Sequence, residues 1–293
     1  MALDLVVFSE ASADLDPSRA DADTTAQTRE ALAHGCEVHF LEAEQAIEPD
    51  ARVVPSLKAG AERPGLWLGR IPTPAHYQRV FDEALACGVR LLNSPAEHLA
   101  SLELSRSVAS LGELTPESIV LHDLAGLDAA VAQLGFPVFV KGGVLSRKAW
   151  GYHSCVPETK EALTSLVQRL LGMHHFSRDT VVLRRLVALR QTGRELEGFP
   201  IAREYRVFVA DGEPLAMGFY WPFGDPFGEL QLAEVAPLVR EAARRVGTPM
   251  MTIDLGQLDD GRWIVIEPGD WQFAGLGSID AKALWNALAK KRS

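Results

Sequence analysis

Two lysines stand around a glycine pair in the segment FVKGGVLSRKAWG, residues 139–151. Lys141 directly follows an apolar run, and Lys148 lies further along the same glycine-bearing segment. A polyphosphate would be held by two cations on such a loop, because a lysine binds phosphate as a point charge. Two simpler interpretations stay open. Lys141 could end a strand at the surface, and Lys148 with Arg147 could be a solvated basic cluster.

A second set of candidate residues lies in the stretch MMTIDLGQLDDGRWIVIEPGD, residues 250–270. Asp260-Gly261 is typical of a two-residue type I′ hairpin loop. If it forms the loop, Asp254 lies opposite Glu267, with Cβ atoms about 4.5–5.5 Å apart. Like charges there destabilise a sheet, and a divalent cation would offset them. Asp270 could add a third oxygen, and an oxygen-only site of this kind suits Mg²⁺.

The alternative is that these two acids face solvent at a sheet edge, as surface carboxylates commonly do. Both of them, however, stand on strands that are otherwise strongly apolar, which favours a buried pair with a compensating charge. A register shift by one residue would turn a side chain to the other face and break the argument. The apolar neighbours are Ile253, Leu255, Ile264 and Ile266.

The elements that would position these residues follow from hydrophobic periodicity. Residues 1–95 predict a small parallel α/β layer, because short apolar runs alternate with helical patterns. Residues 74–87 show helical spacing, and Gly88 is a stop signal. The expected strands are 3–8, 36–41, 65–69 and 89–95, and a polar helix is expected at 20–34.

The remainder predicts an α+β part with antiparallel hairpins. Asp211-Gly212 marks a hairpin over 205–220, and a second hairpin is expected over 250–267. Residues 232–246 form an amphipathic helical pattern that ends before Gly247. A mostly helical stretch is expected at 96–135, strands at 136–141 and 180–189 with a loop behind the latter, and helices at 158–172 and 280–290.

Composition excludes several classes of protein. The apolar fraction of 47% allows a sizeable core, and a net charge of −10 argues against a nucleic-acid surface, which needs a basic stripe. Three widely separated cysteines favour a reducing cytoplasm over a disulfide framework. No apolar stretch reaches the roughly 18 residues of a membrane span, and MALDLVVFSE reads as a strand, not a signal peptide. The sequence has no P-loop, no dinucleotide fingerprint and no G-x-S-x-G elbow.

In their order, these segments resemble an ATP-grasp enzyme over roughly residues 95–280. GFPVFVK resembles the strand with the nucleotide lysine, and VVLRRLV (181–187) the hinge strand between lobes. REYRVFVADGEPLA resembles the next hairpin, with its E-x-R-x-F-V pattern, and the 250–270 stretch resembles the metal-binding hairpin. The chain is most similar to the uncharacterised clade named for one arginine and two lysines.

The resemblance implies a fold and a division of the chain. The fold is an ATP-grasp fold, in which two α+β subdomains grip ATP, preceded by a small parallel α/β domain. We therefore expect an N-terminal domain at 1–95 and an ATP-grasp domain at 96–293. Within the latter, the small lobe would span about 115–188 and the large lobe 189–293.

The resemblance also implies a role for each candidate residue. Lys141 would contact the α and β phosphates, and Lys148 would cover the β and γ phosphates. Arg206 would meet the γ-phosphate or an acyl-phosphate, so that Arg206 and Lys148 are the catalytic candidates. The remaining candidates are Arg185, Leu186 and Val187 for adenine, Glu204 for ribose, and Asp254, Glu267 and Asp270 for Mg²⁺.

Three departures from the family pattern are visible. Gly269 stands where a metal-binding asparagine is usual, and Arg185 stands where a hinge glutamate is common. The family's earlier lysine has no obvious counterpart, and Arg106 is the nearest candidate.

The implied activity is ligation. ATP would phosphorylate a carboxylate of a small molecule or peptide, and an amine or thiol would attack the acyl-phosphate. Arg70 is a candidate for holding the carboxylate, although it could equally be an ordinary surface arginine. Two other functions stay open: a small-molecule kinase on the same fold, and a nucleotide-binding protein without catalysis.

Overall fold

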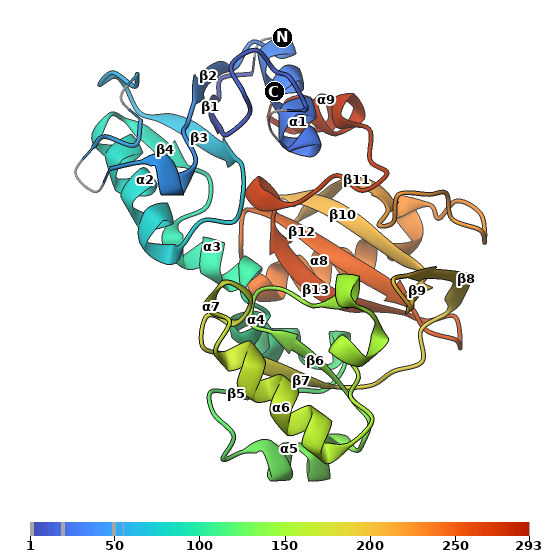
Figure 1. Ribbon diagram of the computed structural model, residues 1–293. Helices are drawn as coiled ribbons and strands as arrows, with labels where there is room; N and C mark the ends of the chain where they lie inside the picture. Colours follow the sequence, from blue (N-terminus) through green and yellow to red (C-terminus); the bar gives the residue numbers. More distant parts are fainter. Residues whose placement is uncertain (1–2, 19–20, 49–50, 55, 293) are drawn as a thin grey trace.

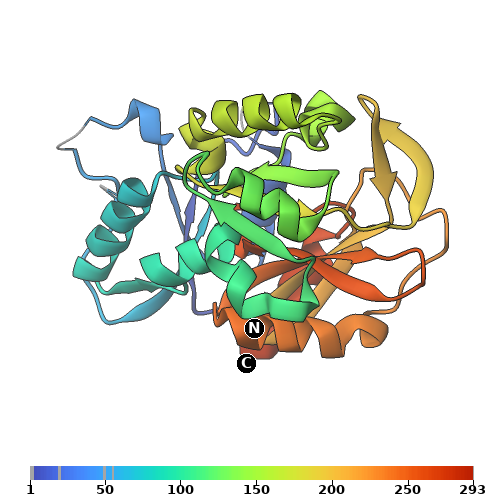
Figure 2. The ribbon, with the colours of Figure 1, turned by 90° about the horizontal axis from the view of Figure 1, so that it is seen from below.

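The structure is a computed structural model that describes residues 3–18, 21–48, 51–54 and 56–292. Its elements form three bodies around a common centre (Figure 1). An N-terminal body is followed by a small lobe and then by a large lobe, and Figure 2, seen from below, shows the N-terminal body at the left and the small lobe in front of the large lobe. No helix among the described residues is long and apolar enough to cross a bilayer.

A parallel sheet forms the N-terminal body, as the alternation of apolar runs and helical patterns predicts. Its strands pair in the order β2-β1-β3-β4. Helix α2 begins after Thr73 because that side chain accepts a hydrogen bond from the backbone N–H of His76, and Pro74 suits the first turn. The elements are β1 (Val6–Ser9), α1 (Ala22–Ala33), β2 (Glu37–Phe40), η1 (Glu44–Ala46), β3 (Arg63–Leu68), α2 (Pro74–Ala86) and β4 (Val89–Leu91).

The small lobe has an antiparallel sheet in the order β5-β7-β6. Helices α5 and α6 pack on one face through a fully apolar cluster, and the other face is turned towards the large lobe (Figure 2). The elements are β5 (Ser118–Leu121), α5 (Leu127–Leu134), β6 (Val138–Gly142), η3 (Lys148–Trp150), η4 (Tyr152–Ser154), α6 (Lys160–Leu171), α7 (His174–Ser177) and β7 (Val181–Arg185).

The large lobe has an antiparallel sheet in the order β11-β10-β12-β13, with α8 on its outer face. Asp211 and Gly212 have φ values of 48° and 78°, as in a type I′ turn, so the predicted hairpin with an Asp-Gly turn is confirmed. Helix α8 has the predicted bounds and ends at Gly247, whose φ is 77°. The elements are β10 (Glu204–Ala210), β11 (Glu213–Phe219), α8 (Leu232–Val246), β12 (Met250–Gln257) and β13 (Trp263–Asp270).

The turn between β12 and β13 differs from the prediction. Leu258 donates to the carbonyl of Arg262, so the loop has three residues, 259–261, and Gly261 takes a φ of 90°. The predicted two-residue loop at Asp260-Gly261 is therefore wrong. This longer turn sets a register that, if it continued unchanged along the hairpin, would place Asp254 opposite Ile266 and not opposite Glu267.

A β-bulge restores the predicted pairing. Leu255 pairs with Val265, but the next pair is Asp254 with Glu267, so Ile266 is an extra residue in β13. The prediction that the two acids face each other is confirmed, although the turn that supported it is different.

The sequence failed to indicate one hairpin. Strands β8 (Gln191–Leu196) and β9 (Phe199–Ala202) pair where a loop is expected. Their turn is Glu197-Gly198, and both residues have positive φ. Glu-Gly lacks the asparagine or aspartate that makes such a turn visible in a sequence.

The connecting helices tie the bodies together. Helices α3 (Pro95–Leu102) and α4 (Leu104–Leu111), with η2 (Gly112–Leu114), lead into the small lobe, and η5 (Trp271–Phe273) follows β13. Helix α9 (Ala281–Arg292) returns to the N-terminal body and packs against α1 (Figure 1). The two ATP-grasp lobes hold β5 to β7 and β8 to β13, while the domain boundaries themselves remain predictions.

Candidate functional site

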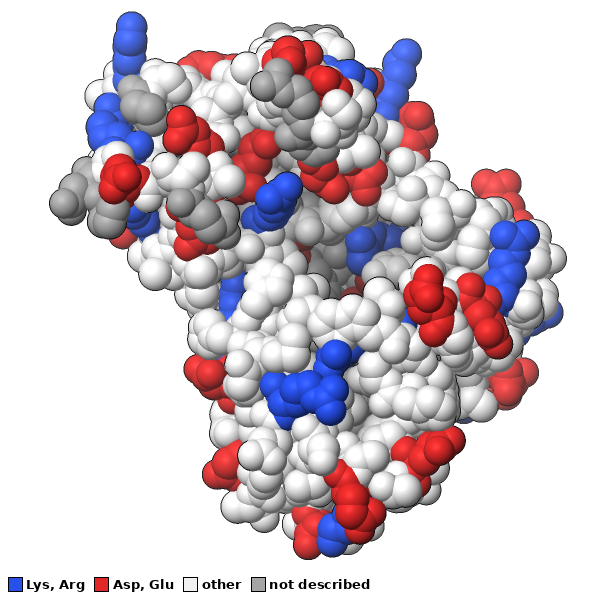
Figure 3. Space-filling view, in the orientation of Figure 1, with Lys and Arg blue, Asp and Glu red and all other residues white. Residues whose placement is uncertain are grey.

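A cavity of about 600 Å³ lies between the two lobes. Its walls are β6 and β7 of the small lobe, the segment 185–189 that joins the lobes, and β9 and β13 of the large lobe. Figure 3 shows a hollow where the three bodies meet, with basic side chains at its walls and acidic side chains on its upper rim. The charged lining residues are Lys141, Lys148, Arg184, Arg185, Glu204, Asp259 and Glu267.

Lys141 reaches this cavity because successive side chains of β6 point to opposite faces of the sheet. Val138 and Val140 are fully buried in the core of the small lobe, so Phe139 and Lys141 take the opposite face and line the cavity. Lys141 is only 3% exposed, and its ammonium group forms an ion pair with Glu267 of the large lobe. The lysine is therefore not a solvated residue at a strand end.

Lys148 is folded down onto the large lobe instead of extending into solvent. Its Nζ lies 3.1 Å from Oε2 of Glu204 and within 6.0 Å of the ring centroids of Phe199, Tyr220 and Trp221. Burial, the largest single effect, favours the neutral amine, but Glu204, Tyr220 and Glu267 together outweigh it and raise the pKa of Lys148. Burial likewise raises the pKa of Glu204, against the opposing charge of Lys148.

Arg206 and the two facing acids form a row across three neighbouring strands. Arg206 on β10 pairs in register with Asp254 on β12, which pairs with Glu267 on β13. The guanidinium donates two hydrogen bonds to Asp254, at 2.8 Å and 2.7 Å, and a third to the carbonyl of Gly275. The Arg206 carbon Cζ also lies 4.7 Å from the ring centroid of Tyr220.

Glu267 is the acid of this row that a ligand can reach most easily. Its side chain is 28% exposed, whereas that of Asp254 is 5% exposed. Burial disfavours its ionised form, but Lys141, and more weakly Lys148 and Arg184, lower the pKa of Glu267 overall. Glu267 is therefore ionised at neutral pH and available to a cation.

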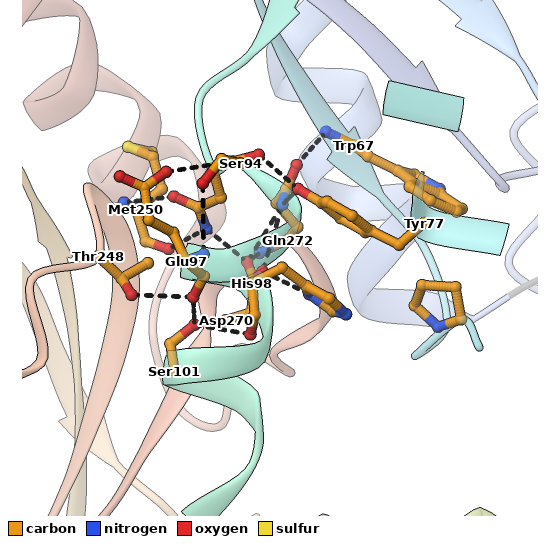
Figure 4. Close-up of polar contacts among 12 residues, drawn as sticks. Trp67, Tyr77, Ser94, Glu97, His98, Ser101, Thr248, Met250, Asp270 and Gln272 are labelled. Atoms are coloured by element: carbon orange, nitrogen blue, oxygen red, sulfur yellow. Dashed lines mark hydrogen bonds and ion pairs between the residues drawn. The ribbon is translucent and has the colours of Figure 1, made fainter. Parts of the chain in front are cut away.

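Asp270 lies elsewhere, on the opposite face of β13. It stands three positions after Glu267, and an odd separation along a strand turns the side chain to the other face. Its carboxylate accepts hydrogen bonds from Asn93 and Gln272 and lies 2.8 Å from Nδ1 of His98 (Figure 4). The interpretation of Asp270 as a third metal ligand needs correction, because this carboxylate joins the large lobe to the N-terminal body. No group of three metal-ligating side chains gathers among the described residues.

Gly269 is the residue of β13 that shares the face of Glu267. It pairs with Thr252 of β12. A Cβ at position 269 would lie 2.5 Å from Oγ1 of Thr252, so the threonine fills the space of a side chain there. On this face of β12 and β13 the two carboxylates are those of Asp254 and Glu267, and position 269 contributes no side-chain oxygen.

The hinge residues line the other end of the cavity. The side chain of Arg185 points outwards and pairs with Glu117 at 2.5 Å. Leu186 and Val187 line the cavity, and no main-chain hydrogen bond between described residues uses their amide or carbonyl groups. This end thus offers backbone donors and acceptors beside apolar walls.

Sequence reasoning missed Arg184, which also lines the cavity and is only 4% exposed. The alternation of β7 carries the signal. Val181 and Leu183 face the core of the small lobe, so the side chain of Arg184 points into the cavity, whereas that of Arg185, at the cavity edge, turns outwards to Glu117. In the register, Arg184 lies opposite Phe139, whose side chain lines the same cavity.

The two gripping lobes, with a charged cavity between them, define an ATP-grasp fold. Residues 133–288, more than half of the chain, match a family described as an ATP-grasp domain, the third family of the clade named for one arginine and two lysines. The protein belongs to this family.

Solved structures show the same fold. A RimK domain protein of the ATP-grasp type from Sphaerobacter thermophilus is 15% identical, with a TM-score of 0.63 over 97% of this chain and 98% of that chain. The ATP-grasp ligase PsnB in complex with a minimal precursor is 16% identical, with a TM-score of 0.60 over the whole of both chains. D-cycloserine synthetase DcsG is 14% identical, with a TM-score of 0.59 over 99% of each chain. No curated protein matches the chain in sequence.

Proposed function

We propose that the protein is an ATP- and Mg²⁺-dependent ligase that joins a carboxylate to an amine or a thiol through an acyl-phosphate. The observation that carries the proposal is the cavity between the lobes, which is lined by the backbone of Leu186 and Val187 and by Lys141, Lys148, Glu204 and Glu267, with Arg206 and Asp254 next to Glu267 in the sheet. Two proteins of similar fold are described as a ligase and a synthetase, which supports the same class of reaction. We place the reaction in the cytoplasm.

The chemistry of the cavity fits a nucleotide. The apolar walls suit the adenine ring, and the backbone groups of Leu186 and Val187 suit its polar edge. Glu204, in the same cavity, would accept a hydrogen bond from a ribose hydroxyl while it remains close to Lys148. The apolar lining of the cavity includes Phe139, Val156, Leu189 and Ile266.

The phosphate end fits a metal-bound triphosphate. Lys141, Lys148 and Arg206 each form an ion pair with an acid of the site. When the nucleotide binds, phosphate oxygens would take the place of the acids beside these three cations, and a metal cation would bind the acids. Asp254 and Glu267 would hold Mg²⁺, which would neutralise charge on the phosphate oxygens.

The chain's own residues would position the reactants. A substrate carboxylate oxygen attacks the γ-phosphorus, ADP leaves, and an acyl-phosphate forms. The amine or thiol then attacks the acyl carbon, loses its proton and releases phosphate. Arg206 would stabilise the charge of the transferred phosphoryl group. The segment that carries Lys148 would exclude water, which would otherwise hydrolyse the acyl-phosphate.

The acceptor would enter from the N-terminal body. In a parallel sheet, ligands bind outside the carboxyl ends of the strands where the strand order reverses. Here that point lies between β1 and β3, which end beside Glu10 and Arg70. Arg70 is exposed, and its backbone N–H donates to Glu10. PsnB binds a precursor peptide, which supports a peptide as one class of substrate.

Replacing Lys141 by Met should weaken the binding of ATP in the presence of Mg²⁺ by about 10-fold or more, because a charge-assisted hydrogen bond contributes about 1.5–3 kcal/mol. Calorimetry on the wild-type and variant proteins measures the effect. Lys160→Met is the matched control, since Lys160 is an exposed lysine of the same lobe. Equal affinity of wild-type and Lys141→Met proteins would remove Lys141 from the site.

Binding without catalysis is the second candidate function, and Gly269 favours it because the metal-facing side of β13 carries a single acid. ATP binding with no release of ADP, across a panel of carboxylates with amines and thiols, would support this candidate. A stable phosphorylated product that forms without a second substrate would instead indicate a kinase. If the wild-type protein binds no ATP with or without Mg²⁺, the nucleotide proposal fails.

A further inference from the structure

The bulge in β13 decides which way Glu267 points. With a constant register, Asp254 would lie opposite Ile266, and Glu267 would share the face of Val265, which is fully buried in the core against α8. Because Ile266 is an extra residue, both Ile266 and Glu267 line the cavity instead. The side chain of Glu267 therefore points into the cavity only because β13 has this bulge.

Two side chains from the small-lobe part of the chain hold the carbonyl groups of the bulge. A bulge disrupts the ladder locally, and a buried carbonyl needs another donor. Thr115 donates from Oγ1 to the carbonyl of Val265 at 2.8 Å, and Arg184 donates from Nη1 to the carbonyl of Ile266 at 2.7 Å. Arg184 also donates from Nη2 to Oγ1 of Thr115 at 2.5 Å, so the two side chains act together.

Contacts within the small lobe also hold Arg184 in place, in addition to its contact with the bulge. It stands in the central strand of the small-lobe sheet, and its Nε donates to Oγ of Ser118 at 3.2 Å. Burial lowers the pKa of Arg184 to about 10, with Glu267 opposing the shift, so the guanidinium is charged at neutral pH. Its orientation is set by three acceptors on two segments, the hydroxyls of Thr115 and Ser118 and the carbonyl of Ile266, which leaves it little freedom to move away from β13.

We propose that Arg184, together with Thr115, is a positioning residue that fixes the β13 bulge and thereby directs Glu267 towards the metal. This inference rests on the proposed function, since it assigns a metal to Glu267. It adds that the placement of the carboxylate depends on contact between the lobes, because the donors precede the hinge and the acceptors follow it.

The test compares the Mg²⁺ dependence of ATP binding in four purified proteins: wild type, Arg184→Met, Thr115→Val and Arg169→Met. We expect Arg184→Met to raise the Mg²⁺ concentration that gives half of the maximal increase in ATP affinity by at least about 10-fold. Thr115→Val should raise this concentration by about 3-fold. Binding of ATP without Mg²⁺ should change little in Thr115→Val. Arg169→Met is the matched control, because Arg169 is an exposed arginine of α6 in the same lobe, and this variant should behave as wild type.

A purely structural role for Arg184 predicts a different result. Arg184→Met and Thr115→Val would then lower the thermal midpoint while the Mg²⁺ dependence stays at the wild-type value, and that outcome would overturn the inference. If Arg184→Met does not fold, Arg184→Lys and Thr115→Val decide by the same criterion. A wild-type protein that shows no Mg²⁺-dependent binding overturns the proposed function and this inference together, whereas unchanged variants beside a metal-dependent wild type overturn only the inference.

Discussion

Glu267→Gln should lose Mg²⁺-dependent release of ADP from ATP by about 10²–10³-fold or more, the loss typical when one stabilising group for developing charge is removed. The amide keeps the shape of the side chain, and it can still accept a hydrogen bond from Lys141, but it carries no charge for a metal. In calorimetry, the affinity of the variant for ATP should be nearly the same with and without Mg²⁺.

Glu195→Gln is the matched control for this experiment, because Glu195 is an exposed residue of β8. The control should keep the wild-type response to Mg²⁺, and circular dichroism should show that both variants are folded. A Glu267→Gln protein with full Mg²⁺-dependent turnover would contradict the assignment of this carboxylate to the metal.

Asp270→Ala should lower the free energy of unfolding by about 3–5 kcal/mol, because truncation of one partner leaves the others buried without their acceptor. Asp270 is 1% exposed, and the substitution would strip hydrogen bonds from Asn93, His98 and Gln272 at the junction of the large lobe and the N-terminal body (Figure 4). Urea-induced unfolding, followed by tryptophan fluorescence, measures the loss.

Asp260→Ala provides the comparison, since Asp260 lies in an exposed turn and pairs only with its neighbour Arg262 among the described residues. Its effect should stay within about 0.5 kcal/mol. An Asp270→Ala protein of wild-type stability that has lost its response to Mg²⁺ would restore Asp270 as a metal ligand and would argue against the junction described above.

The pairing of Asp254 with Glu267 shows which part of the site could be predicted from the sequence and which part could not. Alternation of apolar residues and an Asp-Gly turn suffice to predict the hairpin and the pairing of the two acids. The real turn is longer by one residue, and the bulge compensates for it. The donors that hold the bulge stand 150 and 82 residues away, so no local pattern could have indicated it.

The other differences have local causes that stricter use of strand periodicity exposes. Asp270 stands an odd number of residues after Glu267, and Arg184, not Arg185, has the parity of a cavity-facing residue in β7. Only the β8–β9 hairpin had no such signal, because its Glu-Gly turn resembles an ordinary loop.

The return of α9 to the N-terminal body has a consequence for how the chain is made. Leu284, Trp285 and Leu288 are fully buried in one cluster with Leu5 and Ala31. Domains generally fold in order as the ribosome releases them. Here the N-terminal body cannot complete its core until α9 has emerged, so its apolar surface stays open while both lobes are being synthesised. We therefore expect a chaperone to bind the nascent chain. A fragment cut after residue 95 would lack α9 and is a poor choice for expression on its own.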